Sequence, residues 1–136
     1  MKKVVFSILA VVLVMTLSAC SSNKLADIYS EDEVVAKAKT IVETINTQDF
    51  DLVVNFVRTD LREQLSADIL ESAWKPILDE SGSFKEYKTA LTYGQKSKST
   101  DEDYAVCVLV CTYEHGTRTF TISFDKDLSA VGLYMK

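Results

Sequence analysis

The spacing of apolar and polar residues changes near residue 82, and the change divides the chain into a helical part and a strand-forming part. Between residues 31 and 46, apolar residues recur every three or four positions, which is the spacing of one helix face. These residues are Val34, Val35, Ala38, Ile41, Val42 and Ile45. Ser30 and Glu33 form a capping box in front of them. We therefore predict a first helix over residues 31–46.

Two further helices are predicted before residue 82. Asp49 can cap the second helix and Ser66 can cap the third, because both side chains accept hydrogen bonds from free amides. The apolar face of the second consists of Phe50, Val53, Val54 and Val57. The apolar stripe of the third consists of Ile69, Leu70, Ala73 and Trp74. Pro76 lacks an amide hydrogen, so we expect a kink or a restart there, and Gly82 can end the helix.

After residue 82 the spacing favours strands. The segment 117–124 alternates cleanly between apolar and polar residues, as a half-buried strand does. The four predicted strands are residues 84–96, 104–113, 117–124 and 128–135. Polar turns separate them, among them residues 114–116. Helices that precede a meander of about four antiparallel strands predict one α+β domain over residues 31–136, with the helices packed on one face of the sheet.

The N-terminal segment has the pattern of an export signal rather than of a folded element. Lys2 and Lys3 precede a nearly unbroken apolar run over residues 4–17, which as a helix is too short to span a bilayer. The residues Leu17, Ser18, Ala19 and Cys20 follow. They resemble the lipobox of bacterial lipoproteins. We predict a signal helix and signal peptide over residues 1–19; the alternative is an ordinary secretory signal with a chance cysteine.

The lipobox resemblance implies a specific modification. Cleavage between Ala19 and Cys20 follows alkylation of the Cys20 thiol by a diacylglyceryl group, and fatty acids such as palmitate then hold the chain in the membrane. Residues 20–30 would form a polar tether. We therefore expect an extracytoplasmic protein that is lipid-anchored to the bacterial cell membrane through Cys20.

The acidic balance of the chain excludes one class of partner. The formal net charge is −5, and removal of Lys2 and Lys3 with the signal takes it to −7. Nucleic-acid binding requires a basic surface, so we expect no nucleic-acid partner. The same charge gives no polybasic attraction to anionic lipid, which leaves the lipid on Cys20 as the contact with the membrane.

The reactive side chains form no catalytic constellation. His115 is the sole histidine and lies in a predicted turn, where solvation is the ordinary outcome. Cys107 and Cys111 are four residues apart in one predicted strand, too far apart to pair, so we expect small buried residues. We predict no metal, no cofactor and no enzymatic activity. The alternative is a small enzyme in which Asp60 or Asp68 works with a tyrosine in a pocket.

A family resemblance covers residues 35–135. It rests on Phe50 and Phe56, on Leu65, Leu70 and Trp74, and on the run Gly82, Ser83 and Phe84. In these positions the chain resembles the family called domain of unknown function 3887. The family is similar to the cystatin-like superfamily that includes nuclear transport factor two. The resemblance implies a cone-shaped domain, with a curved sheet around a long helix that often leaves a pocket, and it implies no catalytic residue.

Four aromatic residues are candidates for lining such a pocket between the helices and the sheet. They are Trp74, Phe84, Tyr87 and Tyr93. They could surround a small apolar ligand with a tyrosine hydroxyl as its polar contact, or they could simply fill the core. We favour a non-catalytic domain that binds a ligand or an envelope protein. Another possibility is a structural envelope protein that forms homodimers through the threonine-rich sheet face of residues 117–123.

Overall fold

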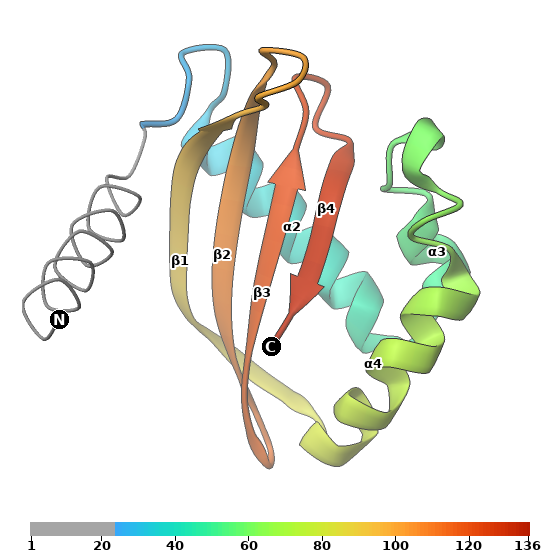
Figure 1. The fold of residues 1–136 in the computed structure, drawn as a ribbon. Coiled ribbons are helices and arrows are strands. Elements are labelled where there is room, and N and C mark those ends of the chain that lie inside the picture. Colours follow the sequence, from blue (N-terminus) through green and yellow to red (C-terminus); the bar gives the residue numbers. More distant parts are fainter. Residues whose placement is uncertain (1–23) are drawn as a thin grey trace, which may run out of the picture.

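The computed structural model describes residues 24–136 and has the predicted α+β architecture, with helices first and strands after them (Figure 1). The predicted signal peptide, the cleavage site at Ala19 and Cys20 and the lipidation of Cys20 lie outside the described residues. The elements are α2 (Glu31–Asn46), α3 (Phe50–Val54), the short 3-10 helix η1 (Thr59–Leu61), α4 (Ala67–Ser81), β1 (Phe84–Lys96), β2 (Asp103–Tyr113), β3 (Gly116–Phe124) and β4 (Ala130–Met135).

Each long helix begins at the residue that the sequence predicts. The hydroxyl of Ser30 accepts a hydrogen bond from the amide of Glu33, and that of Ser66 accepts one from Ile69. The carboxylate of Asp49 caps α3 in the same way. The apolar face of α2 is buried as predicted, except that Val35 is half-buried. α3 ends at Val54, so Val57 lies outside this helix. Val57 instead forms an isolated bridge with Ala130, the first residue of β4.

The third helix differs from its prediction in two respects. It runs from Ala67 to Ser81 without a restart, although Pro76 lies inside it and supplies no amide hydrogen. Its buried stripe is also shifted around the helix, because Ile69 is 49% exposed and Ala73 is exposed. The residues that face the core are Leu70, Trp74, Leu78 and Ser81. Spacings of four and three residues place these side chains on one face.

The four strands form one antiparallel sheet in the order β1-β2-β3-β4, so each strand pairs with its neighbour along the chain. The register of β1 against β2 shifts twice, between Phe84 and Glu86 and between Tyr87 and Thr89. Such bulges bend a strand, and they lie where the long β1–β2 hairpin curves toward α4 (Figure 1). β4 begins at Ala130 rather than at Leu128, because Leu128 has a positive φ of 59° within the preceding turn.

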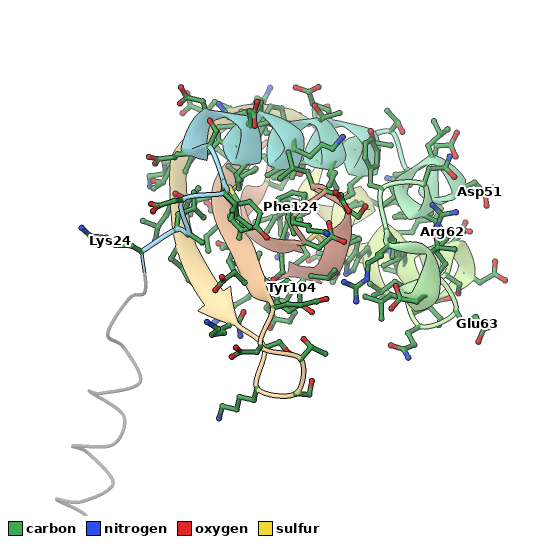
Figure 2. The ribbon with its side chains drawn as sticks, turned by 90° about the horizontal axis from the view of Figure 1, so that it is seen from above. Lys24, Asp51, Arg62, Glu63, Tyr104 and Phe124 are labelled. Atoms are coloured by element: carbon green, nitrogen blue, oxygen red, sulfur yellow. The ribbon has the colours of Figure 1, made fainter. Side chains whose placement is uncertain are left out.

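The hydrophobic core lies between α2 and one face of the sheet. Viewed from above, α2 crosses this face with Phe124 beneath it (Figure 2). Side chains from α2, β2 and β3 that are almost fully buried fill the layer. They include Ile41, Ile45, Leu109, Phe120, Ile122 and Phe124. Over residues 24–136, no helix covers the opposite face, which we call the outer sheet face (Figure 1). Leu91 and Tyr134 on this face are 57% and 62% exposed.

Candidate functional site

The structure brings together two of the four aromatic residues that were candidates for a pocket. The rings of Phe84 and Tyr87 lie 4.8 Å apart between their centroids. Trp74 is buried in the core, only 7% exposed. In the sheet, Tyr93 pairs with Val106. The residues on either side of Val106 are Ala105 and Cys107, which are fully buried on the core side. Tyr93 therefore lies on the outer sheet face.

The bulges of β1 explain this division of the aromatic residues. In a regular strand, Tyr87 and Tyr93 would share a face, and Phe84 would lie on the other. The extra residues at positions 85 and 88 reverse the alternation twice. As a result Phe84 and Tyr87 both face the helices, and Tyr93 faces away from them.

A concavity that includes Phe84 lies at the end of the sheet next to the β2–β3 hairpin, and we call it the hairpin pocket. Its volume is about 300 Å³. It lies where the last turns of α2 and α4 meet the first residues of β1 and the last of β2. It is lined by Asn46, Gln48, Leu78, Asp79, Gly82, Ser83, Phe84, Tyr113 and Glu114.

Two aromatic rings form the apolar wall of the hairpin pocket. Phe84 meets Tyr113 edge to face, with 5.7 Å between the ring centroids. The hydroxyl of Tyr113 donates a hydrogen bond of 2.5 Å to Oδ1 of Asn46. Burial raises the pKa of Tyr113 above its ordinary value, so the hydroxyl stays a donor at any physiological pH. This bond fixes the ring against α2 at the wall of the pocket.

Polar groups form the rim of the hairpin pocket. Nε2 of Gln48 donates to Oδ1 of Asp79 at 2.8 Å, and Nζ of Lys75 donates to Oε1 of Gln48 at 2.7 Å. On the opposite side, Oε2 of Glu114 accepts a hydrogen bond of 3.3 Å from the amide of Ser83. An aromatic wall beside amide and carboxylate groups can hold a small molecule that has an apolar part and hydrogen-bond donors.

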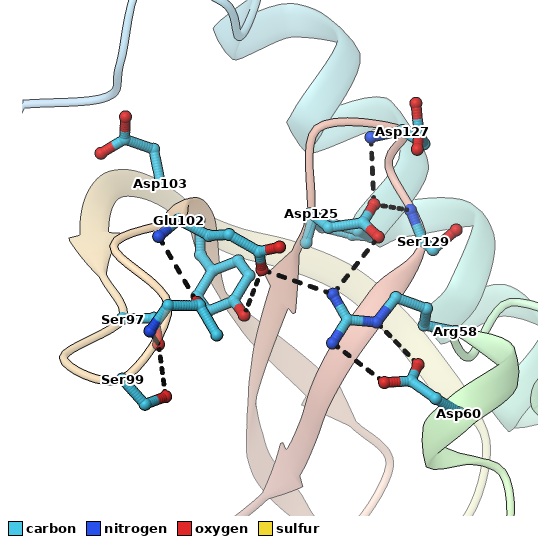
Figure 3. Close-up of polar contacts among 12 residues, drawn as sticks. Arg58, Asp60, Ser97, Ser99, Glu102, Asp103, Asp125, Asp127 and Ser129 are labelled. Atoms are coloured by element: carbon cyan, nitrogen blue, oxygen red, sulfur yellow. Dashed lines mark hydrogen bonds and ion pairs between the residues drawn. The ribbon is translucent and has the colours of Figure 1, made fainter.

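A second polar centre lies at the other end of the sheet, around Arg58 (Figure 3). Nε and Nη2 of Arg58 donate to the two carboxylate oxygens of Asp60 at 2.8 and 3.3 Å. Nη1 lies 3.7 Å from oxygens of both Glu102 and Asp125. The guanidinium therefore links the segment after α3 to the start of β2 and to the β3–β4 turn.

Asp125 is the one buried acid among residues 24–136. Its Oδ1 accepts hydrogen bonds of 3.0 Å from the amides of Asp127 and Ser129, and Oδ2 faces Arg58. The cleft beside it, of about 270 Å³, is lined by Ile28, Arg58, Glu102, Asp103, Tyr104, Asp125 and Lys126. Because each of its charged oxygens has a partner, Asp125 is an acceptor that orders the turn.

The acids and the histidine of the catalytic alternatives are exposed in the structure. Asp60 is exposed and paired with Arg58, whose hydrogen bonds hold the pKa of this carboxyl below its usual range. A carboxyl group that acts as a general acid or base near neutral pH needs a raised pKa instead. Asp68 and His115 are exposed. Over residues 24–136, no three His, Cys, Asp or Glu residues are grouped so that they could hold a metal ion.

The two cysteines of β2 are free thiols in the core, as the sequence predicts. Both are fully buried on the face that α2 covers. Burial raises the pKa of Cys107 and of Cys111 to about 11, which keeps both thiols protonated at neutral pH. They therefore serve as packing residues of the core rather than as nucleophiles.

The sequence did not point to several of the residues that shape the two centres. Asn46, Arg58, Tyr113 and Asp125 carry no motif. Tyr113 and Asn46, which are hydrogen-bonded, are 67 residues apart in the sequence. Arg58 and Asp125, which form an ion pair, are more than 60 residues apart. Only one local signal existed, which is the alternation that assigns Tyr113 to the core face.

Comparison with known proteins supports the fold. A family described as "Protein of unknown function (DUF3887)" matches residues 38–133. The chain is similar in structure to a protein from Ruminococcus gnavus ATCC 29149 that was solved by NMR, with a TM-score of 0.73 and 24% sequence identity. The similarity covers 84% of this chain and 97% of the other. No curated protein matches the sequence.

Proposed function

The chain belongs to the DUF3887 family, and we propose that it is a membrane-anchored extracytoplasmic lipoprotein whose domain binds a ligand or a protein without catalysing a reaction. The observation that carries the proposal is the run Leu17, Ser18, Ala19 and Cys20 directly after an apolar segment with two N-terminal lysines. Two acyl chains on one cysteine give stable membrane binding, because each buried methylene contributes about 0.8 kcal/mol.

The described domain is compatible with an anchor at its N-terminus. Its first described residue is Lys24, four positions after Cys20. Within residues 24–136, no helix combines the length and the apolar character that a bilayer crossing requires. On this proposal, the lipid on Cys20 supplies the anchor.

Replacement of the acylated residue tests the anchor. We expect Cys20→Ala to move the protein from the membrane fraction to the soluble fraction, because the thioether cannot form. Ser21→Ala, one residue further, is the matched control and should leave the protein in the membrane fraction. Intact mass measurement of the membrane form should give the mass of the chain from Cys20 onward plus the acyl groups. A Cys20→Ala protein that stays with the membranes contradicts the proposal.

The hairpin pocket supports the binding part of the proposal. Its lining combines aromatic residues with amide and carboxylate groups, while the acids that a catalytic alternative would use are exposed or paired elsewhere. Screening of small molecules by NMR on the labelled chain tests this directly. We expect ligands with an apolar part and hydrogen-bond donors to shift the amides of Phe84 and Glu114. Phe84→Ala should abolish these shifts, and Phe56→Ala, outside the pocket, should preserve them.

Self-association through the outer sheet face is a second candidate role. The observation that favours it is the exposure of Leu91 and Tyr134, which lie on the same uncovered face as Thr119 and Thr121. Large exposed apolar side chains on one face are typical of protein contact surfaces. A homodimer formed in this way would still carry the anchor and the hairpin pocket on each chain.

A further inference from the structure

The first described residues form a strap, residues 24–30, across the end of the sheet opposite the hairpin (Figure 1). The main chain of Lys24 lies directly over Gly94 of β1. A Cβ atom at position 94 would lie 2.3 Å from the carbonyl oxygen of Lys24 and 3.1 Å from its carbonyl carbon. Both contacts are with backbone, which cannot turn aside as a flexible side chain can. The strap therefore requires glycine at position 94.

Two further contacts fasten the strap to the sheet. Leu25 and Tyr29 pack against the hydrophobic core. The hydroxyl of Tyr29 donates a hydrogen bond of 2.6 Å to the carbonyl oxygen of Asp103 and also lies 3.4 Å from that of Phe124. Burial, with the nearby acids, raises the pKa of Tyr29 to about 12, so the hydroxyl stays a donor. From Lys24 onward the chain therefore moves with the domain.

The fastened strap leaves a short connection to the anchor. Of the tether predicted over residues 20–30, only residues 20–23 precede the strap. Four residues span at most about 14 Å. β1, with 13 residues, extends about 40 Å from the strap end toward the hairpin end. The connection between Cys20 and the strap is therefore much shorter than the domain is long.

We propose that the strap end of the domain faces the bilayer and that the hairpin pocket is presented away from it. This inference rests on the proposed lipid anchor at Cys20. At the strap end, Ile28 is 67% exposed at the rim of the cleft beside Arg58, and the other charged residues of this cleft are Glu102, Asp103, Asp125 and Lys126. An isoleucine side chain at that point can enter the headgroup region.

Depth-dependent quenching tests the orientation on the full acylated chain in vesicles of phosphatidylglycerol and phosphatidylethanolamine, with nitroxide-labelled headgroups as the quencher. Ser99→Trp places a probe in the loop at the strap end, and His115→Trp places one in the hairpin. The two positions are separated by the length of β2, roughly 35 Å. The parent chain, with buried Trp74 alone, gives the baseline. We expect quenching several-fold stronger at position 99 than at position 115.

Equal quenching of the two probes, or stronger quenching at position 115, would overturn the proposed orientation. Flotation of the chain with the vesicles reports separately on the anchor. If the chain is not acylated, coupling a maleimide phospholipid to Cys20 supplies an anchor at the same residue, and the same two quenching outcomes decide. Cys107 and Cys111 do not compete for the maleimide because both are buried.

A substitution beneath the strap tests whether the attachment of the strap to the sheet sets the orientation of the domain. Gly94→Ala displaces the main chain of Lys24, which lengthens the connection between Cys20 and the sheet and should reduce the difference in quenching between positions 99 and 115. Gly132→Ala is the matched control, because its added methyl group would meet only the Ser123 side chain at 3.4 Å or more. An unchanged difference in a folded Gly94→Ala protein would show that the strap does not set the orientation.

Discussion

The hydrogen bond between Tyr113 and Asn46 joins the last residue of β2 to the last residue of α2. It is the polar contact that closes the helix onto the sheet beneath the hairpin pocket, and it is made between residues 67 positions apart. Within residues 24–136 the buried hydroxyl makes no other hydrogen bond, so this bond satisfies a group that burial would otherwise leave unpaired.

Removal of this hydroxyl should weaken the domain. We expect Tyr113→Phe to lower the free energy of unfolding by about 1–2 kcal/mol, because the side chain of Asn46 loses its partner. Urea unfolding followed by the fluorescence of Trp74, which is buried, measures the change. Tyr134→Phe is the control on an exposed tyrosine and should change the free energy by less than about 0.5 kcal/mol. Equal effects of the two substitutions would contradict the role of the bond.

Arg58 should influence the stability of the domain in acid. Its hydrogen bonds hold the pKa of Asp60 below the usual range, so in acid the unfolded chain binds this proton more readily than the folded chain. The resulting stabilisation is present above the usual pKa of about 3.9 and is lost as the pH falls through the lowered value. We expect Arg58→Gln to flatten the dependence of unfolding free energy on pH below about 4.

Lys75→Gln is the control for this acid dependence. Lys75 pairs with the exposed Asp79 at 3.6 Å on the surface of α4, and an exposed pair of this kind contributes little. Unfolding curves at several pH values compare the two variants with the parent chain. The interpretation fails if Arg58→Gln keeps the acid dependence of the parent.

The thiols of the core should resist modification in the folded protein. We expect iodoacetamide at pH 8 to leave Cys107 and Cys111 unmodified, because both are buried and protonated. The same treatment in guanidinium should modify both. Mass measurement with and without reductant should give the same intramolecular mass, since the two thiols are free. A difference of two daltons would indicate a disulfide and would refute this account.

Alkaline conditions should destabilise the domain through the same thiols. The pKa of each is raised to about 11 by burial, above the ordinary value of 9.0. The folded chain therefore binds more protons than the unfolded chain between these values, and stability falls as the pH rises from about 9 to about 11. We expect the double substitution of Cys107 and Cys111 by alanine to reduce this fall, measured by urea unfolding at pH 8 and pH 11. A fall of unchanged size would assign the effect to other groups.

The outer sheet face should promote weak self-association. We expect light scattering of the chain in detergent to give a mass that rises with concentration, and we expect Thr121→Lys to abolish the rise. Thr121 lies between Val108 and Tyr134 on this face, so a lysine there places a charge in the centre of any contact. Thr47→Lys, exposed at the end of α2, is the control for added charge. A constant monomer mass for the parent chain would exclude a homodimer.

The bulges of β1 show where prediction from the sequence stops. The sequence predicts the strand and its ends, because alternation and β-branched residues are local features. Strict alternation, however, places Tyr87 and Tyr93 together, and the two register shifts separate them. A bulge leaves no clear mark in the sequence, since it depends on how the strand fits its neighbour and the helix above it. The hairpin pocket therefore has a different lining from the predicted pocket, and Phe84 is the one predicted residue that lines it.

The sequence by itself determined the features that rest on neighbouring residues: the caps at Ser30, Asp49 and Ser66, and the change from helical to strand spacing. The anchor at Cys20 stays a prediction from the sequence. Tertiary structure alone decided which distant groups meet. The contacts of Arg58 with Asp125 and of Lys24 with Gly94 each join segments more than 60 residues apart. Capping and periodicity act within one or two turns of the chain, whereas these contacts depend on strand register and on the packing of the whole domain.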